Sequence, residues 1–230
     1  SCYSGLLVHM QELILDSVFG PHAHTRVLVS GNTKSPRSAL ILMHGRGASA
    51  EHIFSILENV SLPEWLVVLA PEAHDKSWYP VRFFESKVQN EPHLTSALSV
   101  VGALIDMVER SYGIGTTEVS LAGFSQGACL ISEYLLERPS QFKGACIFSG
   151  GIIGNDAEVK SLPVANSLLQ TPVYMGCDVA DPHIPLSRFK QTKIALEAAG
   201  ALMTYREYEG LRHAIHPDGL QFLGQLMRMR

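Results

Sequence analysis

The sequence predicts a doubly wound α/β fold, with helices on both faces of a mostly parallel sheet and no large lid domain. Two observations predict it: short, continuously apolar runs that are typical of strands buried on both faces, and helical segments that alternate with them. The 230 residues are 46% hydrophobic and 17% charged, which is typical of a globular protein with a sizeable core. We therefore expect residues 1–230 to form one α/β domain.

The strands are expected in the following order. Residues 25–29 are expected to start the sheet as an edge strand, although the first thirty residues have no clear pattern. The remaining strands are expected at residues 39–43, 66–70, 119–123, 145–149, 173–176 and 203–208. Because ligands of such a sheet bind beyond the carboxyl ends of its strands, the loops that follow these runs are the candidate functional regions.

Helical segments occupy the stretches between the strands. Residues 94–108 place apolar side chains at steps of three and four, which gives a helix with one apolar stripe. Gly200 suits the left-handed end of one helix, and Pro217 suits the first turn of another. Further helices are expected at residues 49–59, 128–137, 186–199 and 217–229, and residues 155–170 are expected to form a surface excursion.

Composition argues against several classes of partner and site. The net charge of −4 gives no reason to expect nucleic acid or an anionic membrane as a partner, and no apolar segment is long enough for stable membrane insertion. Residues 1–5 lack the features of a secretory signal. His22 and His24 form an H-x-H pair without a third ligand, so no metal site is expected.

The cysteines favour a cytoplasmic protein. They show neither a C-x-x-C pair nor the spacing of a zinc site, and they are Cys2, Cys129, Cys146 and Cys177. Cys129 falls in an expected helix and Cys146 in an expected strand, and both are expected to be small buried side chains. The sequence leaves the oligomeric state open between a monomer and a homodimer.

The pentapeptide Gly123-Phe124-Ser125-Gln126-Gly127 is the most informative motif. It reads G-x-S-x-G and lies between an expected strand and an expected helix, which is the context of a nucleophile elbow. The glycines are needed because a side chain at either position would crowd the neighbouring backbone of a tight turn. The alternative is a Gly/Ser turn between two core elements. The motif makes Ser125 the candidate nucleophile.

A serine hydroxyl needs a base, and the chain order Ser, acid, His directs the search to the loop after the last strand. His213 and His216 both lie there. His216 directly precedes Pro217 and is expected to help start the final helix, so His213 is the favoured base. For the acid, Asp178 and Asp181 both follow the strand at residues 173–176, and their spacing does not choose between them.

An oxyanion hole requires backbone N–H groups aimed at the oxygen that gains charge. One is expected from Gln126, which follows the nucleophile at the start of a helix. The other is expected from Arg46, in the turn His44-Gly45-Arg46-Gly47 after an early strand. The alternative for this turn is a Gly-rich connection without a chemical role.

Four motifs in this order resemble the phospholipase/carboxylesterase family of α/β-hydrolases, which includes acyl-protein thioesterases and small bacterial carboxylesterases. The motifs are L-x-H-G-x-G, G-F-S-Q-G, D-P-x-I-P and G-L-R-H, and the likeness runs from about Leu40 to the end of the chain. The resemblance puts the nucleophile on Ser125, the base on His213, the oxyanion donors on Arg46 and Gln126, and the acid on Asp181, which opens the D-P-x-I-P block. Asp181 lies five positions after Gly176, where three is usual, and this leaves Asp178 as a reserve acid.

The resemblance implies a serine hydrolase that cleaves small carboxylic esters through an acyl-enzyme, without a metal or organic cofactor. Trp78, Tyr79 and Phe83, with Phe84, are expected either to wall an apolar pocket for the substrate or to pack a loop onto the sheet. This stretch resembles the bacterial branch more than the eukaryotic thioesterases. The absence of a long insertion favours short-chain or small aryl esters.

Three alternatives stay open at this point. The same triad could serve an acyl-thioesterase or a lysophospholipase. The fold could also bind a small molecule without turning it over. Dienelactone-type hydrolysis would require a cysteine nucleophile, whereas the nucleophile position holds Ser125 and Cys129 lies one helical turn further on.

Overall fold

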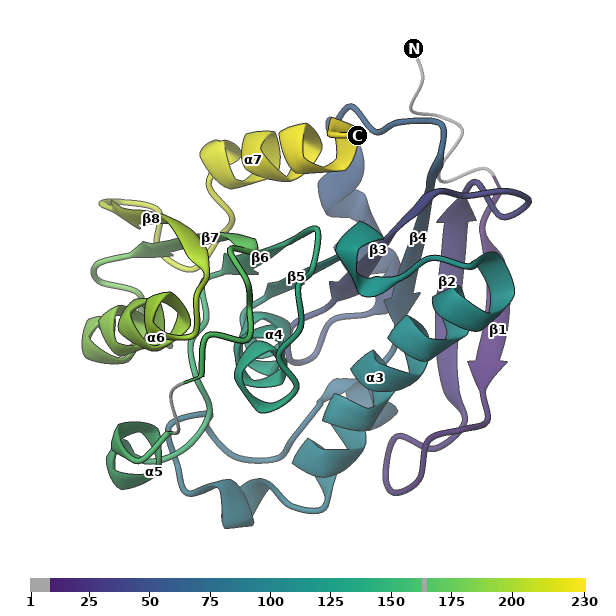
Figure 1. Ribbon diagram of the computed structural model, residues 1–230. Helices are drawn as coiled ribbons and strands as arrows, with labels where there is room; N and C mark the ends of the chain where they lie inside the picture. Colours follow the sequence, from purple (N-terminus) through teal and green to yellow (C-terminus); the bar gives the residue numbers. More distant parts are fainter. Residues whose placement is uncertain (1–8, 163–164) are drawn as a thin grey trace.

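The computed structural model describes residues 9–162 and 165–230, and a twisted sheet runs through its centre (Figure 1). In this part of the chain eight strands form the sheet in the order β1-β2-β4-β3-β5-β6-β7-β8. β1 pairs antiparallel with β2, and β2 pairs antiparallel with β4, while all other pairs are parallel. The strands are β1 (Gln11–Leu15), β2 (Thr25–Gly31), β3 (Ser38–Met43), β4 (Leu66–Pro71), β5 (Val119–Phe124), β6 (Gly144–Phe148), β7 (Pro172–Asp178) and β8 (Leu202–Tyr208).

Helices cover both faces of the sheet, as the sequence predicts. The α-helices are α2 (Ala50–Phe54), α3 (His93–Tyr112), α4 (Gln126–Glu137), α5 (Asp156–Lys160), α6 (Leu186–Ala198) and α7 (Pro217–Arg228). Short 3₁₀ turns are η1 (Ser55–Leu57), η2 (His74–Lys76), η3 (Lys87–Asn90) and η4 (Thr116–Glu118). Buried side chains of α3, α4 and α6 pack on one face, and those of α2 and α7 pack on the other. No separate lid domain is present among the described residues.

The central strands are apolar throughout because they bury both of their faces. Every residue of β3 and β4 is buried. Successive side chains of β3 alternate between two cores: Ile41 and Met43 belong to the α3–α4 layer, whereas Leu40 and Leu42 belong to the α2–α7 layer. The predicted parallel sheet with two helical layers is therefore confirmed.

The first strand of the sheet differs from the prediction. Residues 25–29 do form a strand, β2, but β1 pairs along its outer side, so β1 is the edge. The short β1 has mostly exposed or half-buried residues, including Gln11 and Glu12. Such a strand lacks the continuous apolar run that marks a central strand, and for this reason the sequence pattern did not show it.

Other boundaries follow the sequence closely. The apolar stripe lies on α3, which ends at Gly113 with a φ of 69°. Helix α4 starts two residues earlier than expected, directly after Ser125. The excursion at residues 155–170 contains the short helix α5, and Cys2 lies outside the described residues. In the described ranges, no helix is long and apolar enough to span a membrane.

Strand order brings distant loops together at one edge of the sheet. β3 and β5 are neighbours, so the turn after β3 lies beside the turn after β5. β7 and β8 follow on the other side of β6, and their loops reach the same edge. The carboxyl ends of four strands thus assemble one candidate site.

Candidate active site

The turn after β5 holds Ser125 in a strained conformation. Its φ of 55° and ψ of −117° lie outside the regions that residues with a side chain usually adopt. The Ser125 N–H donates to the carbonyl of Phe148, 3.0 Å away, which ties the turn to β6. This is the geometry of a nucleophile elbow.

The two glycines of the motif are required by close packing. A Cβ at Gly123 would lie 2.5 Å from the carbonyl group of Gly127. A Cβ at Gly127 would overlap the backbone carbonyl of Met43 in the adjacent strand. The elbow can therefore approach β3 only because both positions lack a side chain.

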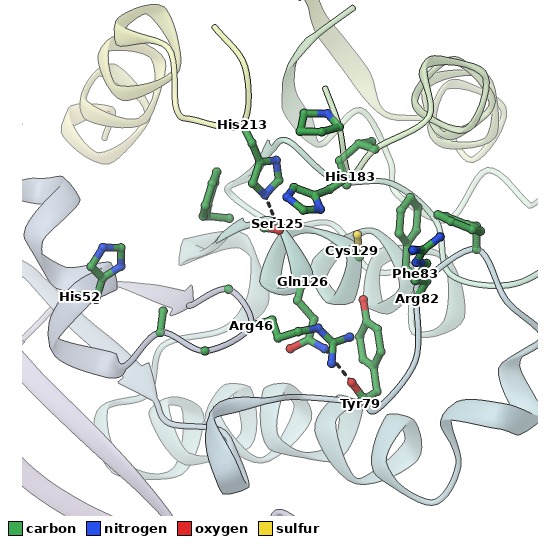
Figure 2. A pocket seen from close by; sticks show the side chains of 17 residues that line it. Arg46, His52, Tyr79, Arg82, Phe83, Ser125, Gln126, Cys129, His183 and His213 are labelled. Carbon is green, nitrogen blue, oxygen red and sulfur yellow. Dashed lines mark hydrogen bonds between the residues drawn. The ribbon is translucent and has the colours of Figure 1, made fainter. Parts of the chain in front are cut away.

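Ser125, His213 and Asp181 form a continuous chain of hydrogen bonds. The Asp181 Oδ2 atom lies 2.7 Å from Nδ1 of His213, and Nε2 of His213 lies 2.7 Å from Oγ of Ser125. A carboxylate can only accept, so Nδ1–H donates to it and Nε2 of the neutral ring accepts the Ser125 hydroxyl proton. The arrangement can take a proton from Ser125 (Figure 2).

Asp181 is prepared to stay ionised. Burial opposes its charge, but the hydrogen bond from His213 and the backbone N–H groups of His183 and Ile184 outweigh it, so the pKa of Asp181 is lowered. Its Oδ1 atom accepts those two N–H groups at 2.7 and 3.0 Å. The thiol of Cys177 lies 3.7 Å from Oδ2. Each carboxylate oxygen therefore has a partner.

Asp178, the reserve acid, has another part in the structure. Its Oδ1 accepts from the N–H of Ala180 and its Oδ2 from the N–H of Arg212, both at 2.7 Å. These bonds from the backbone lower the pKa of Asp178. Arg212 has a φ of 62° and directly precedes His213, so Asp178 joins the loop after β7 to the loop that carries the histidine.

Aromatic contacts hold the ring of His213 from two sides. Phe124 lies 4.9 Å away and His183 lies 4.6 Å away, measured between ring centroids. His216 instead caps α7, because its Nδ1 accepts from the N–H of Asp218, and it stacks on Tyr208. As expected, His216 helps to start the final helix, whereas His213 lies beside Ser125.

The turn after β3 lies against the elbow. Gly45 packs so closely that a Cβ there would lie 3.3 Å from the carbonyl oxygen of Phe124. His44 fixes the turn: its Nδ1 donates to the carbonyl of Gly45, and its Nε2 accepts from the N–H of Ala73. Arg46 and Gln126 line one cavity with Ser125, and no described residue accepts a hydrogen bond from either backbone N–H.

That cavity has a volume of about 590 Å³, in the range of small-molecule sites. We refer to residues 72–92, between β4 and α3, as the 72–92 loop. Tyr79, Phe83 and Phe84 from this loop line the cavity. Further lining side chains come from the elbow, α2, α4 and the loop after β7, and include His52, Phe124, Cys129, His183 and Ile184.

Trp78 does not line the cavity, so the expectation that it forms a wall of the substrate pocket is corrected. It is fully buried, its indole N–H donates to the carbonyl of His44, and its backbone N–H donates to the Gln126 side chain. Trp78 therefore packs the 72–92 loop onto the sheet, which was the alternative for the aromatic stretch. A periodic pattern could not separate it from Tyr79, because both follow the same strand.

Within the described ranges, no group of three His, Cys, Asp or Glu side chains could hold a metal ion. His22 is buried against Trp78, whereas His24 is exposed and faces Asp16. The two histidines of the H-x-H pair thus point to different surroundings.

Comparison with known proteins identifies the family. The family model described as Phospholipase/Carboxylesterase matches residues 24–229. The chain belongs to this family. It is therefore a carboxylic ester hydrolase with the α/β-hydrolase fold.

Other members of the phospholipase/carboxylesterase family resemble the chain over most of its length. A probable carboxylesterase SOBER1-like from Arabidopsis thaliana is 26% identical, over 84% of this chain and 79% of its own. Acyl-protein thioesterase 1 from Saccharomyces cerevisiae is 22% identical, over 87% and 96%. The crystal structure of a phospholipase/carboxylesterase from Dyadobacter fermentans has a TM-score of 0.81 at 33% identity, covering 88% of this chain and 96% of that one.

Sequence reasoning missed several residues around the site of this family member. Phe124 is the first variable residue of the G-x-S-x-G motif, and His183 is the variable residue of the D-P-x-I-P block. Arg82 lies within the aromatic stretch at residues 78–84 and also lines the cavity. The position of each residue in a motif or in the aromatic stretch was a signal in the sequence. Whether its side chain reaches the cavity, however, depends on the conformation of the loop.

Proposed function

We propose that the protein hydrolyses short-chain or small aryl carboxylic esters through an acyl-enzyme on Ser125. The observation that carries the proposal is the hydrogen-bonded chain from Ser125 through His213 to Asp181, which opens into the cavity. Ester hydrolysis is the activity of the family, and to it we add the catalytic residues and the small size of the substrate.

The first step is attack of Ser125 Oγ on the ester carbonyl carbon. His213 Nε2 takes the hydroxyl proton as the C–O bond forms, and Asp181 stabilises the resulting imidazolium. The carbonyl oxygen gains negative charge and accepts from the backbone N–H groups of Arg46 and Gln126. Collapse of this intermediate breaks the bond to the alcohol, which takes the proton from His213.

The second step releases the acyl group. A water molecule gives a proton to His213 Nε2 and its oxygen attacks the acyl carbonyl carbon. The bond to Ser125 Oγ then breaks, and the serine recovers its proton from His213. The products are the alcohol and the free acid, and no redox partner is consumed.

Cavity size supports small substrates. About 590 Å³ accommodates an ester of modest size, and among the described residues no lid domain covers it. Cys129 does not serve as an alternative nucleophile, because burial raises the pKa of its thiol to about 12 and keeps it protonated. This argues against the dienelactone-type reaction.

A fluorophosphonate probe and the Ser125→Ala variant test the nucleophile. We expect the wild type to be labelled and to hydrolyse p-nitrophenyl acetate, and the variant to do neither while its circular dichroism is unchanged. A wild type that neither reacts with the probe nor cleaves activated esters would instead support a binding protein.

Acyl length tests the substrate class. We expect kcat/KM on p-nitrophenyl esters to be highest between acetate and hexanoate and to fall for longer chains. Thioesters of the same acids, run beside the oxygen esters, test the thioesterase alternative. A steady rise in kcat/KM up to palmitate would contradict the assignment to short chains.

A further inference from the structure

The cavity is cationic although the chain is not. Two arginines, Arg46 and Arg82, line it together with three histidines, and no Asp or Glu side chain does. The whole chain has a net charge of −4, so this sign is a local property. Low-dielectric walls of one charge raise the local concentration of an oppositely charged substrate.

Arg46 is held in place without losing its charge. Its guanidinium donates to Oγ of Ser77 at 2.9 Å and to the carbonyls of Pro80 and Val81 at 3.1 Å, all of which are neutral. Three of the five guanidinium N–H bonds are used in this way. No described carboxylate forms an ion pair with Arg46, so its positive charge remains to act on the cavity.

Arg82 adds a second positive charge. It is exposed, lies over the ring of Phe84 at 5.9 Å, and forms no ion pair within the described part of the chain. A neighbouring hollow shares Arg46 and Arg82 and also contains Glu85, which does not line the cavity itself.

Tyr79 provides a hydroxyl donor at the wall of the cavity. Its side chain lines the cavity and is 1% exposed, and among the described residues no oxygen or nitrogen atom accepts from its Oη, which lies beside the Cys129 thiol. Burial raises the pKa of Tyr79 well above its usual value, so the hydroxyl keeps its proton. Figure 2 shows the hydroxyl end of Tyr79 turned toward Cys129 and Phe83, at the end of the cavity where Arg82 lies. A thiol is a weak acceptor, so a ligand oxygen is a stronger partner for this hydroxyl.

The reaction geometry indicates which part of the ester reaches this end. The leaving oxygen must face His213 Nε2, and the carbonyl oxygen must face the N–H groups of Arg46 and Gln126. The acyl chain takes the remaining direction. In Figure 2, Tyr79 and Arg82 lie on the side of Ser125 opposite His52.

We propose that the preferred substrate carries a carboxylate on its acyl group, as in a monoester of a short dicarboxylic acid. The acyl carbons pack on Phe83, and the carboxylate accepts from the Tyr79 hydroxyl and the Arg82 guanidinium, with Arg46 adding to the positive field. This inference rests on the proposed function of the same site and adds the chemistry of the acyl group.

The test compares monoethyl glutarate with ethyl hexanoate, a neutral ester of similar length, by release of ethanol. We expect the wild type to give a higher kcat/KM on monoethyl glutarate, and added salt to reduce the preference. Tyr79→Phe and Arg82→Gln should each lower the ratio of the two kcat/KM values about tenfold, chiefly through KM. Tyr79→Phe removes the hydroxyl and its contact with the Cys129 thiol but keeps the ring, and a role of Tyr79 in packing alone would affect both esters equally and leave the ratio unchanged.

Lys34→Gln is the matched control, because it removes an exposed positive charge outside the cavity and should leave the ratio unchanged. Equal or better turnover of ethyl hexanoate by the wild type would overturn the inference and leave the proposed function intact. Failure of the wild type to cleave either ester would count against the proposed function itself.

A second pair of esters tests the position of the carboxylate. Phenyl acetate and its para-carboxy derivative differ only in the alcohol part. The para-carboxy ester carries its carboxylate on the alcohol part. We therefore expect that Arg82→Gln does not change the ratio of the two kcat/KM values for this pair. A preference for the para-carboxy ester that Arg82→Gln abolishes would overturn the assignment of the carboxylate to the acyl group.

Discussion

The two sides of the cavity are built in different ways. The elbow at residues 123–127 is held by backbone: Ser125 is strained, and Gly123 and Gly127 touch neighbouring carbonyls. The 72–92 loop is held by side chains: Gln126 donates to the carbonyl of Tyr79, and Arg46 donates to three oxygens of the loop. We therefore expect positions on the elbow to tolerate almost no change of shape, and the loop to tolerate exchange of the side chains that face the cavity.

We expect this difference to separate the catalytic chemistry from substrate selectivity. The reacting atoms need placement within fractions of an ångström, which strand ends and close-packed turns supply. Recognition of an acyl group needs only suitable side chains on a loop that is anchored well. We therefore expect substitutions near the elbow to affect kcat or folding, and substitutions in the 72–92 loop to affect KM.

The largest expected effect is on the side of the chemistry. Asp181→Asn should lower kcat about ten-thousand-fold, because an amide no longer holds the required tautomer of His213. Asp178→Asn is the matched control, since Asp178 bonds to backbone N–H groups and not to the ring. Steady-state kinetics on p-nitrophenyl acetate compare the two. A larger loss in Asp178→Asn would reverse the assignment of the acid.

A change of shape at the elbow should chiefly affect folding. Gly127→Ala should reduce the free energy of unfolding by about 4 kcal/mol or more, because the new Cβ overlaps the carbonyl of Met43. Gly115 is the control, because a Cβ there would meet no atom within 4 Å. Gly115→Ala should change the free energy of unfolding by less than about 1 kcal/mol. Urea denaturation measures both. Equal stability of the two variants would contradict the backbone argument.

The base of the 72–92 loop should make stability depend on pH. His22 accepts from the N–H of His74 and donates to the carbonyl of Trp78. Burial lowers the pKa of His22 from 6.5 to about 4, so between these values the unfolded chain binds the extra proton. The contribution of neutral His22 to the free energy of unfolding is fully present above pH 6.5. It falls by up to about 3 kcal/mol as the pH is lowered toward 4.

Urea denaturation at pH 7 and pH 4.5 measures this loss, and His22→Gln should reduce the difference between the two conditions. Asp178 and Asp181 affect stability at lower pH, because their pKa values are lowered. They become protonated only when the pH falls below the usual pKa of an aspartate side chain. An unchanged pH dependence in the His22 variant would exclude this histidine as the cause.

The link between the two sides should give the smallest effect. Gln126→Met removes the bonds from the Gln126 side chain to Trp78, Tyr79 and Ser77, but keeps the Gln126 backbone N–H. We expect a loss of stability of about 2 kcal/mol and a higher KM with a smaller change in kcat. Gln221→Met, at an exposed position on α7, is the control. A large fall in kcat with unchanged KM would show that the two sides are not separable.

Much of the site could be predicted because its signals are local. The elbow is encoded by two glycines around Ser125 between a strand and a helix, and the chain order then leads to His213. The choice between Asp178 and Asp181 could not be predicted from spacing alone. It depends on how two loops, 32 positions apart in the chain, close against each other.

The edge strand β1 and the role of Trp78 were also beyond sequence reasoning. A half-exposed five-residue strand has little pattern, and its place is decided by pairing with β2. Trp78 and Tyr79 are adjacent, yet one packs on the sheet and the other lines the cavity. Alternation along an irregular loop has no fixed period, so only the folded loop separates them.

The sequence by itself determined the α/β fold, the family and the identity of the candidate nucleophile and base. These features depend on short-range sterics and hydrophobic patterns, which involve residues close together in the chain. Only the tertiary structure decided which aspartate meets His213, which aromatic residues face the cavity, and that its charged lining is entirely basic. These features depend on distances between residues far apart in the chain, which are set when the loops pack against the sheet.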